Sequence, residues 1–292
     1  MTEEIIKIAD ISINVRYSLN DKSVVLFLHF SGGNLNMWEG ILPQFENKYS
    51  VIAPDFRGHG KSDKPLAGYH IDDMANDIYL LLRKLNVERC HIVGSSMGAE
   101  IGLSLAASHP ELVLSLVCEG ALYNEFGEYG LFIGTADEIQ HKKDMMRTEL
   151  AKREERVFKT KEEYIEEQRA ELEQKGLWNE HFLAFFEHNL QQKENGNFTY
   201  CYLNHVRTEY VQKYCDLRFE QYYKNVKCPV LFLPSEEEWK DLRIRSILFV
   251  FAGLLDAYEI KHIENSVHAY VWMQLPLTAG KVVKEFISKY DD

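Results

Sequence analysis

The stretch His91-Ile92-Val93-Gly94-Ser95-Ser96-Met97-Gly98-Ala99-Glu100 contains a strand, a sharp turn and the start of a helix. The apolar run 90–93 is typical of a buried strand, and it is broken at Gly94. Apolar residues with helical spacing begin at Met97 and continue to residue 106. Ser96 therefore stands at a strand-to-helix turn, with a glycine two residues away on either side.

This spacing has a physical reason. A serine at such a turn is held in a strained backbone conformation that keeps its hydroxyl clear of the chain. Gly94 and Gly98 lack the Cβ atoms that would clash where strand and helix meet. The following helix points free N–H groups and its positive dipole end at any oxyanion that forms beside the serine. The turn therefore predicts that Ser96 is a nucleophile.

Further strands and helices alternate along the chain on both sides of this turn. Residues 4–19 alternate apolar and polar positions, which predicts an antiparallel hairpin. Alternation of strands and helices predicts an α/β fold whose mostly parallel sheet is flanked by helices. Strands are expected at 24–29, 49–54, 112–118, 228–234 and 257–263, and helices at 37–45, 71–85, 241–254 and 276–290.

The alternating pattern is interrupted in the middle of the chain. Residues 135–195 are rich in Glu, Lys, Arg and Gln with helical spacing, and residues 198–226 are rich in tyrosine and phenylalanine. The charges are interpreted as solvated helix faces, and the tyrosines either pack the segment on the core or line a pocket. We therefore predict a core in two parts, 1–122 and 227–292, with a helical lid inserted at 123–226.

Composition excludes several classes of protein. The net charge of −12 disfavours nucleic acid or an anionic membrane as the main partner. The chain shows no signal peptide and no apolar run long enough for a membrane span. Its five cysteines form no Cys-x-x-Cys pair, which predicts reduced thiols, a cytoplasmic protein and no zinc site.

A nucleophilic serine needs a histidine base, and the base needs a carboxylate that holds its tautomer. In a parallel sheet, such groups gather in loops at the carboxyl ends of the strands. The side chains that satisfy this condition are His29, His59, Glu119, the acidic run 236–238 and His268.

Five motifs in order resemble those of the α/β-hydrolase superfamily, of the lidded esterase type, over roughly 22–122 and 228–290. The stretch His29-x-Ser31-Gly32-Gly33 resembles the oxyanion loop, and residues 55–62 match a loop common in these enzymes. The turn at Ser96 matches the nucleophile elbow. The acidic run after strand 228–234, and Ser266-Val267-His268, occupy the positions of the acid and the histidine.

The resemblance implies a role for each matching residue. Ser96 would be the nucleophile, His268 the general base and Glu238 the acid, with Glu119, Glu237 and Asp241 as alternative acids. The backbone N–H groups of Ser31 and Met97 would form the oxyanion hole. No metal or cofactor would be needed, and His29 and His59 are expected to be structural.

Two positions depart from the pattern of the superfamily. Phe30 replaces the usual glycine after the oxyanion-loop histidine, where its side chain could narrow the acyl pocket or move the Ser31 N–H. Glu238 replaces the more common aspartate.

The resemblance implies a serine hydrolase acting on an ester, thioester or related small acyl substrate. Alternatives are carbon–carbon bond, lactone or perhydrolase chemistry on the same triad, and a non-catalytic ligand-binding or interaction protein. Haloalkane and epoxide chemistry is disfavoured, because the related enzymes carry Asp in place of Ser96. Neither the substrate nor the oligomeric state follows from the sequence.

Overall fold

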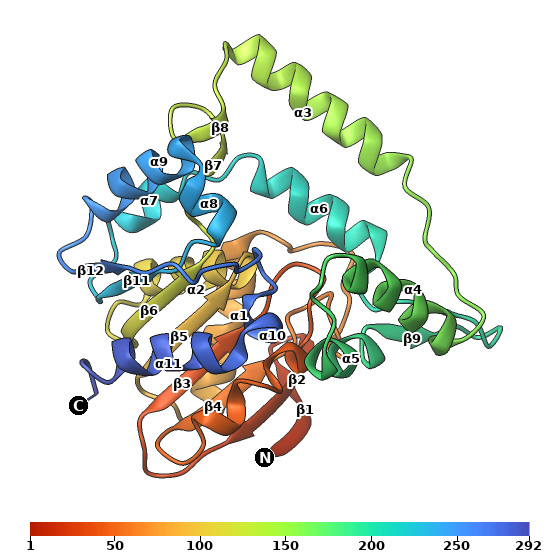
Figure 1. The fold of residues 1–292 in the computed structure, drawn as a ribbon, viewed down its shortest axis with the longest axis horizontal. Helices are drawn as coiled ribbons and strands as arrows, with labels where there is room; N and C mark the ends of the chain where they lie inside the picture. The colour runs from red at the N-terminus through yellow and green to blue at the C-terminus, as the bar shows by residue number, and fades with distance from the viewer. Residues whose placement is uncertain (292) are drawn as a thin grey trace.

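A computed structural model describes residues 1–291, which are built on one eight-stranded sheet (Figure 1). The strand order is β1-β2-β4-β3-β5-β6-β11-β12. The first hairpin is antiparallel, β2 joins β4 antiparallel, and all other neighbours are parallel, which confirms the predicted fold class. The strands are β1 Thr2–Ile8, β2 Ile11–Ser18, β3 Val24–Leu28, β4 Ser50–Pro54, β5 Cys90–Ser95, β6 Val113–Glu119, β11 Val230–Phe232 and β12 Tyr258–Ile260.

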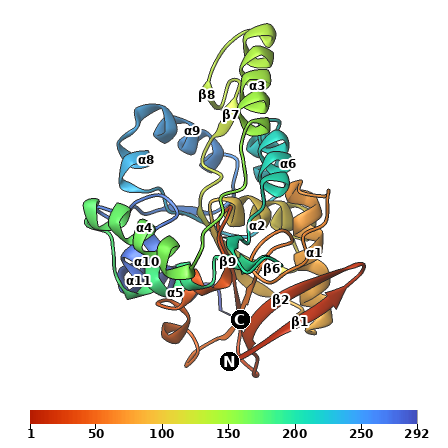
Figure 2. The same cartoon turned by 90° about the vertical axis from the view of Figure 1, so that its right-hand side faces the viewer.

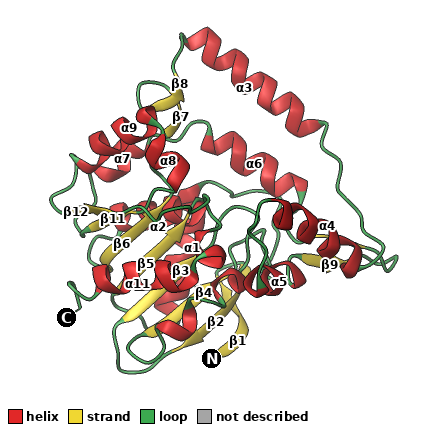
Figure 3. Ribbon diagram, viewed as in Figure 1, coloured by secondary structure: helices red, strands yellow, loops and turns green. Residues whose placement is uncertain are grey.

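The apolar runs are explained by burial of the sheet on both faces (Figure 3). Successive side chains of β3 point to opposite faces, so Val25 and Phe27 join one core while Leu26 and Leu28 join the other. The Val25 side is covered by η1 Leu35–Trp38, η2 Leu42–Gln44, α10 Val271–Gln274 and α11 Pro276–Ile287; the Leu26 side is covered by α1 Ile71–Lys84, α2 Met97–Ser108, α7 Phe219–Tyr223 and α9 Leu242–Ala252.

Two predicted elements differ from the structure, and one helix was not predicted; the helix expected at 241–254 is confirmed as α9 Leu242–Ala252. The helix expected at 37–45 is two short 3₁₀ turns, because Pro43 stands at the start of the second and cannot donate to a continuous helix. The helix expected at 241–254 is preceded by α8 Glu236–Lys240, and Asp241 separates the two by capping α9. The last strand spans only Tyr258–Ile260.

The segment 123–226, called the insertion below, connects β6 to β11. Its helices are α3 Ala136–Ala151, α4 Lys161–Gln174, α5 Glu180–Glu187, α6 Asn204–Tyr214 and α7. Four short strands were not predicted: β7 Asn124–Phe126, β8 Gly130–Phe132, β9 Leu190–Gln192 and β10 Phe198–Tyr200. The helix α3 lies far from the sheet in two perpendicular views (Figures 1 and 2) and buries none of its residues, as expected for solvated faces.

Two further predictions concern the whole described chain. All five cysteines are buried and free, as expected for reduced thiols. Within residues 1–291, every helix is too short or too polar to cross a bilayer.

Candidate active site

Ser96 occupies the strained turn that the sequence predicts. It has φ 50° and ψ −118°, a conformation that L-residues rarely adopt outside functional sites. A Cβ on Gly98 would lie 2.1 Å from the carbonyl oxygen of Leu28, and one on Gly94 would lie 2.5 Å from the backbone nitrogen of Ala99. Both glycines are therefore required by the close approach of strand and helix.

His268 lies in the loop after β12, at the same edge of the sheet as Ser96. Its Nε2 is 3.2 Å from Ser96 Oγ, which is within hydrogen-bond distance for proton transfer. Ser96 is half-buried and the His268 side chain is 39% exposed, so solvent reaches this pair. The structure thus brings the predicted nucleophile and the predicted base together.

Two carboxylates, not one, face the other ring nitrogen of His268. Glu119 Oε1 is 3.0 Å from Nδ1, and Glu238 Oε1 is 3.3 Å from it. Neither contact has the alignment of a hydrogen bond, so Nδ1 lies between the two acids at ion-pair distance. The other two candidate acids do not take part, because Glu237 is exposed and Asp241 accepts the N–H groups of Arg243 and Ile244.

Glu119 is the more extensively bonded of the two acids. Its Oε1 also accepts the backbone N–H of Ala269 at 2.8 Å. Its Oε2 accepts the hydroxyl of Ser95 at 2.7 Å and the indole N–H of Trp272 at 3.3 Å. The side chain is fully buried, and a buried charge is tolerated only with such partners. Glu119 thereby holds the segment that directly follows His268.

Glu238 is held by its own helix. Its Oε2 accepts the backbone N–H of Ser235 at 2.8 Å, and the Ser235 hydroxyl accepts the N–H of Glu238, which forms a capping box at the start of α8. Burial would raise the pKa of Glu238, but contact with His268 and Ser235 outweighs burial and lowers it. Glu238 is therefore held ionised at neutral pH.

The charge of His268 responds to both acids. Burial would lower the pKa of its imidazole, but the negative charges of Glu119 and Glu238 outweigh this and raise the pKa well above its ordinary value. The arrangement therefore stabilises the imidazolium that forms when a histidine accepts a proton from serine.

The same three side chains also have a spacing that suits a metal ion. One ligand atom each from Glu119, Glu238 and His268 lies within 4.8 Å of the others. The Nδ1 of His268 would serve as the ligand, while its Nε2 faces Ser96.

His29 fixes the backbone of the predicted oxyanion loop through hydrogen bonds of its ring. The Nε2 of His29 accepts the N–H of Phe56 at 3.1 Å, so Nδ1 carries the proton and donates to the carbonyl of Phe30 at 2.8 Å. Burial lowers the pKa of His29 to about 4, which keeps the ring neutral. His29 thus has the structural role predicted for it.

Ser31 follows in this loop, and Met97 is the first residue of α2, where backbone N–H groups lack partners within the helix.

Phe30, the unusual residue in this loop, packs against other rings. Its ring centroid is 5.5 Å from that of Phe185 in α5 and 6.2 Å from that of Tyr270, two residues beyond His268. The side chain therefore bridges the oxyanion loop, the insertion and the histidine loop, in a position where glycine could make none of these contacts.

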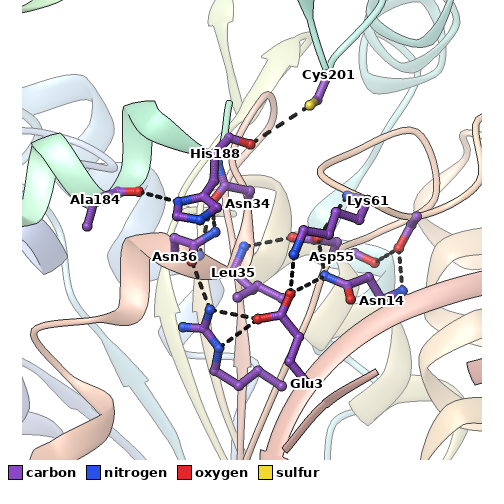
Figure 4. Close-up of polar contacts among 12 residues, drawn as sticks. Glu3, Asn14, Asn34, Leu35, Asn36, Asp55, Lys61, Ala184, His188 and Cys201 are labelled. Carbon is purple, nitrogen blue, oxygen red and sulfur yellow. Dashed lines mark hydrogen bonds and ion pairs between the residues drawn. The ribbon is translucent and has the colours of Figure 1, made fainter. Parts of the chain in front are cut away.

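The loop 55–62 is structural in this arrangement (Figure 4). The Asp55 carboxylate accepts the N–H of Leu35 and the amide of Asn14, both at 2.8 Å, and so ties the segment after the oxyanion loop to β2. His59 contacts the carbonyl of Arg57 at 2.9 Å and stacks on Tyr202. His59 has no contact with Ser96 or His268 and fits the structural role predicted for it.

Two contacts from the insertion were not anticipated. The Tyr202 hydroxyl is 2.8 Å from Ser31 Oγ, and the Tyr210 hydroxyl donates to Glu100 Oε2 at 2.8 Å. Glu100 is buried and is the only charged residue of α2. A lone charge in an otherwise apolar helix was the sequence signal that could have identified it.

Comparisons with known proteins agree with this fold. A family model described as "alpha/beta hydrolase fold" matches residues 23–226. The chain is 34% identical over 139 residues to a fluoroacetate dehalogenase of Burkholderia sp, covering 45% of each protein. It is 38% identical over 112 residues to a 2-(acetamidomethylene)succinate hydrolase of Mesorhizobium japonicum, covering 38% of this chain and 40% of the relative.

Structural similarity extends further than sequence similarity. The chain resembles a crystal structure of E-2-(acetamidomethylene)succinate hydrolase with a TM-score of 0.75 at 21% identity, covering 98% of this chain and 99% of the other. That likeness shows the fold alone, and the curated relatives are matched over less than half of their own length. Because the family model covers more than half of the chain, this protein belongs to the α/β-hydrolase fold family.

Proposed function

We propose that this protein is a serine hydrolase that cleaves an ester, thioester or related acyl substrate through an acyl-enzyme on Ser96. The observation that carries the proposal is the 3.2 Å contact of Ser96 Oγ with His268 Nε2 at a strained elbow, with two carboxylates behind the imidazole. This is the arrangement that activates a serine hydroxyl.

The reaction proceeds in two halves. Neutral His268 takes the hydroxyl proton of Ser96 as Oγ bonds to the acyl carbon, and the resulting imidazolium returns that proton to the leaving group as its bond to carbon breaks. Water then attacks the acyl-enzyme and gives one proton to His268, which returns it to Ser96 Oγ as the bond from Oγ to the acyl carbon breaks, so that the acid leaves and the serine and the neutral base are restored. The N–H groups of Ser31 and Met97 donate to the developing oxyanion.

We assign the main positioning role to Glu119, with Glu238 as a second carboxylate. Glu119 is the closer to Nδ1 and also holds Ala269 and Trp272, which follow the base in the chain. Glu238 adds a second negative charge but directs its other oxygen to Ser235. This assignment exchanges the ranks that sequence reasoning gave to the two acids.

The relatives support hydrolysis as the reaction class, since one is named a hydrolase and another a dehalogenase. Their substrates are not assigned to this chain. A protein that only binds ligands would not need the Ser96–His268 contact, which favours an enzyme over that alternative.

The test measures hydrolysis of p-nitrophenyl esters of increasing chain length, together with labelling by a fluorophosphonate whose site is mapped by mass spectrometry. We expect turnover and labelling at Ser96, with both lost in Ser96→Ala and retained in Ser288→Ala, a matched change on the surface. Labelling without turnover of any ester would favour specialised chemistry or ligand binding. Labelling of Ser96→Ala at the wild-type rate would contradict the proposal.

A further inference from the structure

We propose that Glu100 forms a subsite for a positively charged amine of the substrate, next to the nucleophile. The inference rests on the proposed function, because the subsite serves the substrate that Ser96 attacks. It would make this enzyme select acyl compounds that carry an ammonium group near the scissile bond.

The position of Glu100 follows from the helix. Its backbone N–H donates to the carbonyl of Ser96 at 3.2 Å, the first turn of α2. The charge of His268 acts to lower the pKa of Glu100, so the carboxylate lies within electrostatic reach of the base that Ser96 contacts. Glu100 stands one turn of α2, ~5 Å along the helix axis, beyond the backbone of Ser96.

One oxygen of this buried carboxylate has no partner. Oε2 accepts the Tyr210 hydroxyl at 2.8 Å, whereas Oε1 accepts no hydrogen bond from residues 1–291. The side chain is 4% exposed, and Oε1 is not one of the fully buried, unbonded polar atoms of residues 1–291, so it touches a space that a water molecule can enter. A buried carboxylate oxygen normally has a donor, and a ligand could supply one here.

The charge of Glu100 is also unbalanced. Among residues 1–291, no lysine or arginine forms an ion pair with it. Burial raises the pKa of Glu100 to about 7, while Tyr210 and the charge of His268 act in the opposite direction. A bound cation would favour the ionised form and compensate the buried charge.

The surroundings of Glu100 are aromatic. Burial, together with the Glu100 charge, raises the pKa of several tyrosine hydroxyls, which shows that these rings lie within electrostatic reach of the carboxylate. They come from the insertion and from the loop after β6: Tyr123, Tyr210 and Tyr214. Tyr202 lies within the same reach, but its ring already stacks on His59 and has the Arg207 guanidinium carbon 5.0 Å from its centroid. Tyrosine faces attract cations, quaternary ammonium groups in particular. A carboxylate among tyrosines suits an ammonium group better than it suits an anion.

The test compares two esters of one acid that have nearly the same shape, a choline ester and its uncharged 3,3-dimethylbutyl analogue. We expect wild type to show a kcat/KM about tenfold higher for the choline ester. In Glu100→Gln the ratio of the two kcat/KM values should fall to about one. Glu285→Gln, an exposed change of the same kind, should keep the wild-type ratio. An unchanged ratio in Glu100→Gln, or a wild-type preference for the neutral ester, would overturn the inference.

A second measurement tests the subsite if the Glu100→Gln protein does not fold, or if wild type hydrolyses neither ester. Tetramethylammonium should slow fluorophosphonate labelling of wild-type Ser96, and an equal concentration of tert-butanol should not. Tyr210→Phe keeps the carboxylate and should keep this protection. Equal effects of the two compounds would refute the cation subsite alone, whereas no labelling of Ser96 would refute the proposed function and the subsite with it.

Discussion

Replacing Glu119 with glutamine should damage the enzyme much more than the same change at Glu238. The two charges lie at nearly equal distances from Nδ1, 3.0 and 3.3 Å. At an effective dielectric constant of about 20, these distances correspond to about 5.5 and 5 kcal/mol. Solvent at the partly exposed imidazole screens both attractions, so we expect about 2 kcal/mol from each charge, the usual size for an opposite charge this close to an ionisable group. Charge alone therefore cannot rank the two acids.

The hydrogen bonds that Glu119 and Glu238 accept distinguish the two acids. Both oxygens of Glu119 accept from groups that can only donate, the N–H of Ala269 on one side and the indole N–H of Trp272 on the other. The –NH₂ of a glutamine would face a donor in either orientation, and the resulting shift of the segment that carries His268 should misplace the base and add about 2 kcal/mol to the barrier. In Glu238→Gln the amide oxygen can still accept from Ser235. We expect kcat to fall about 10³-fold in Glu119→Gln and about 30-fold in Glu238→Gln.

The assay is steady-state hydrolysis of p-nitrophenyl acetate at saturating substrate, with thermal unfolding measured in parallel. Glu237→Gln, an exposed neighbour, is the matched control and should equal wild type. An equal or larger loss in Glu238→Gln, or near-wild-type kcat in a folded Glu119→Gln protein, would refute this reasoning and restore Glu238 as the principal acid.

Three further results are expected. The first concerns pH: nearby carboxylates raise the pKa of His268, so the fraction of neutral base increases with pH and kcat/KM should rise through a midpoint above 6.5. Glu119→Gln should move that midpoint to lower pH. An unmoved midpoint would contradict the role assigned to Glu119. Dialysis against EDTA should leave ester hydrolysis unchanged, whereas a loss reversed by added Zn²⁺ would show that the acids and His268 hold a metal. Gly120→Ala should lower the unfolding free energy by about 2 kcal/mol in chemical denaturation and slow the labelling of Ser96. The reason is that Gly120 has φ +138° and the new Cβ would lie 2.6 Å from Ser96 Cα. Normal stability and normal labelling would show that the turn can relax.

The departure at Phe30 shows what a local pattern cannot settle. The sequence identified the bulky residue in the oxyanion loop, and either a narrowed pocket or a shifted N–H was a reasonable expectation. The ring packs on Phe185 and Tyr270, which lie far away along the chain. Which way a side chain turns depends on such long-range neighbours.

The sequence by itself determined the sheet, the elbow and the candidate base. Apolar runs, glycine spacing and strand–helix alternation are local signals, and parallel strands place their carboxyl-end loops together without further information. Ser96 and His268 could therefore be paired across 172 residues. The four short strands of the insertion carried too few residues to show a period.

Only the tertiary structure decided which acids face the base and what surrounds the nucleophile. The sequence favoured Glu238 over Glu119, and the approach of both acids to one nitrogen depends on the alignment of β6 with β11 and on the course of two loops. Glu100 meets Tyr210 only because the insertion folds back over α2. Distances of about 3 Å between side chains far apart in the chain depend on the packing of the whole molecule, which no local pattern contains.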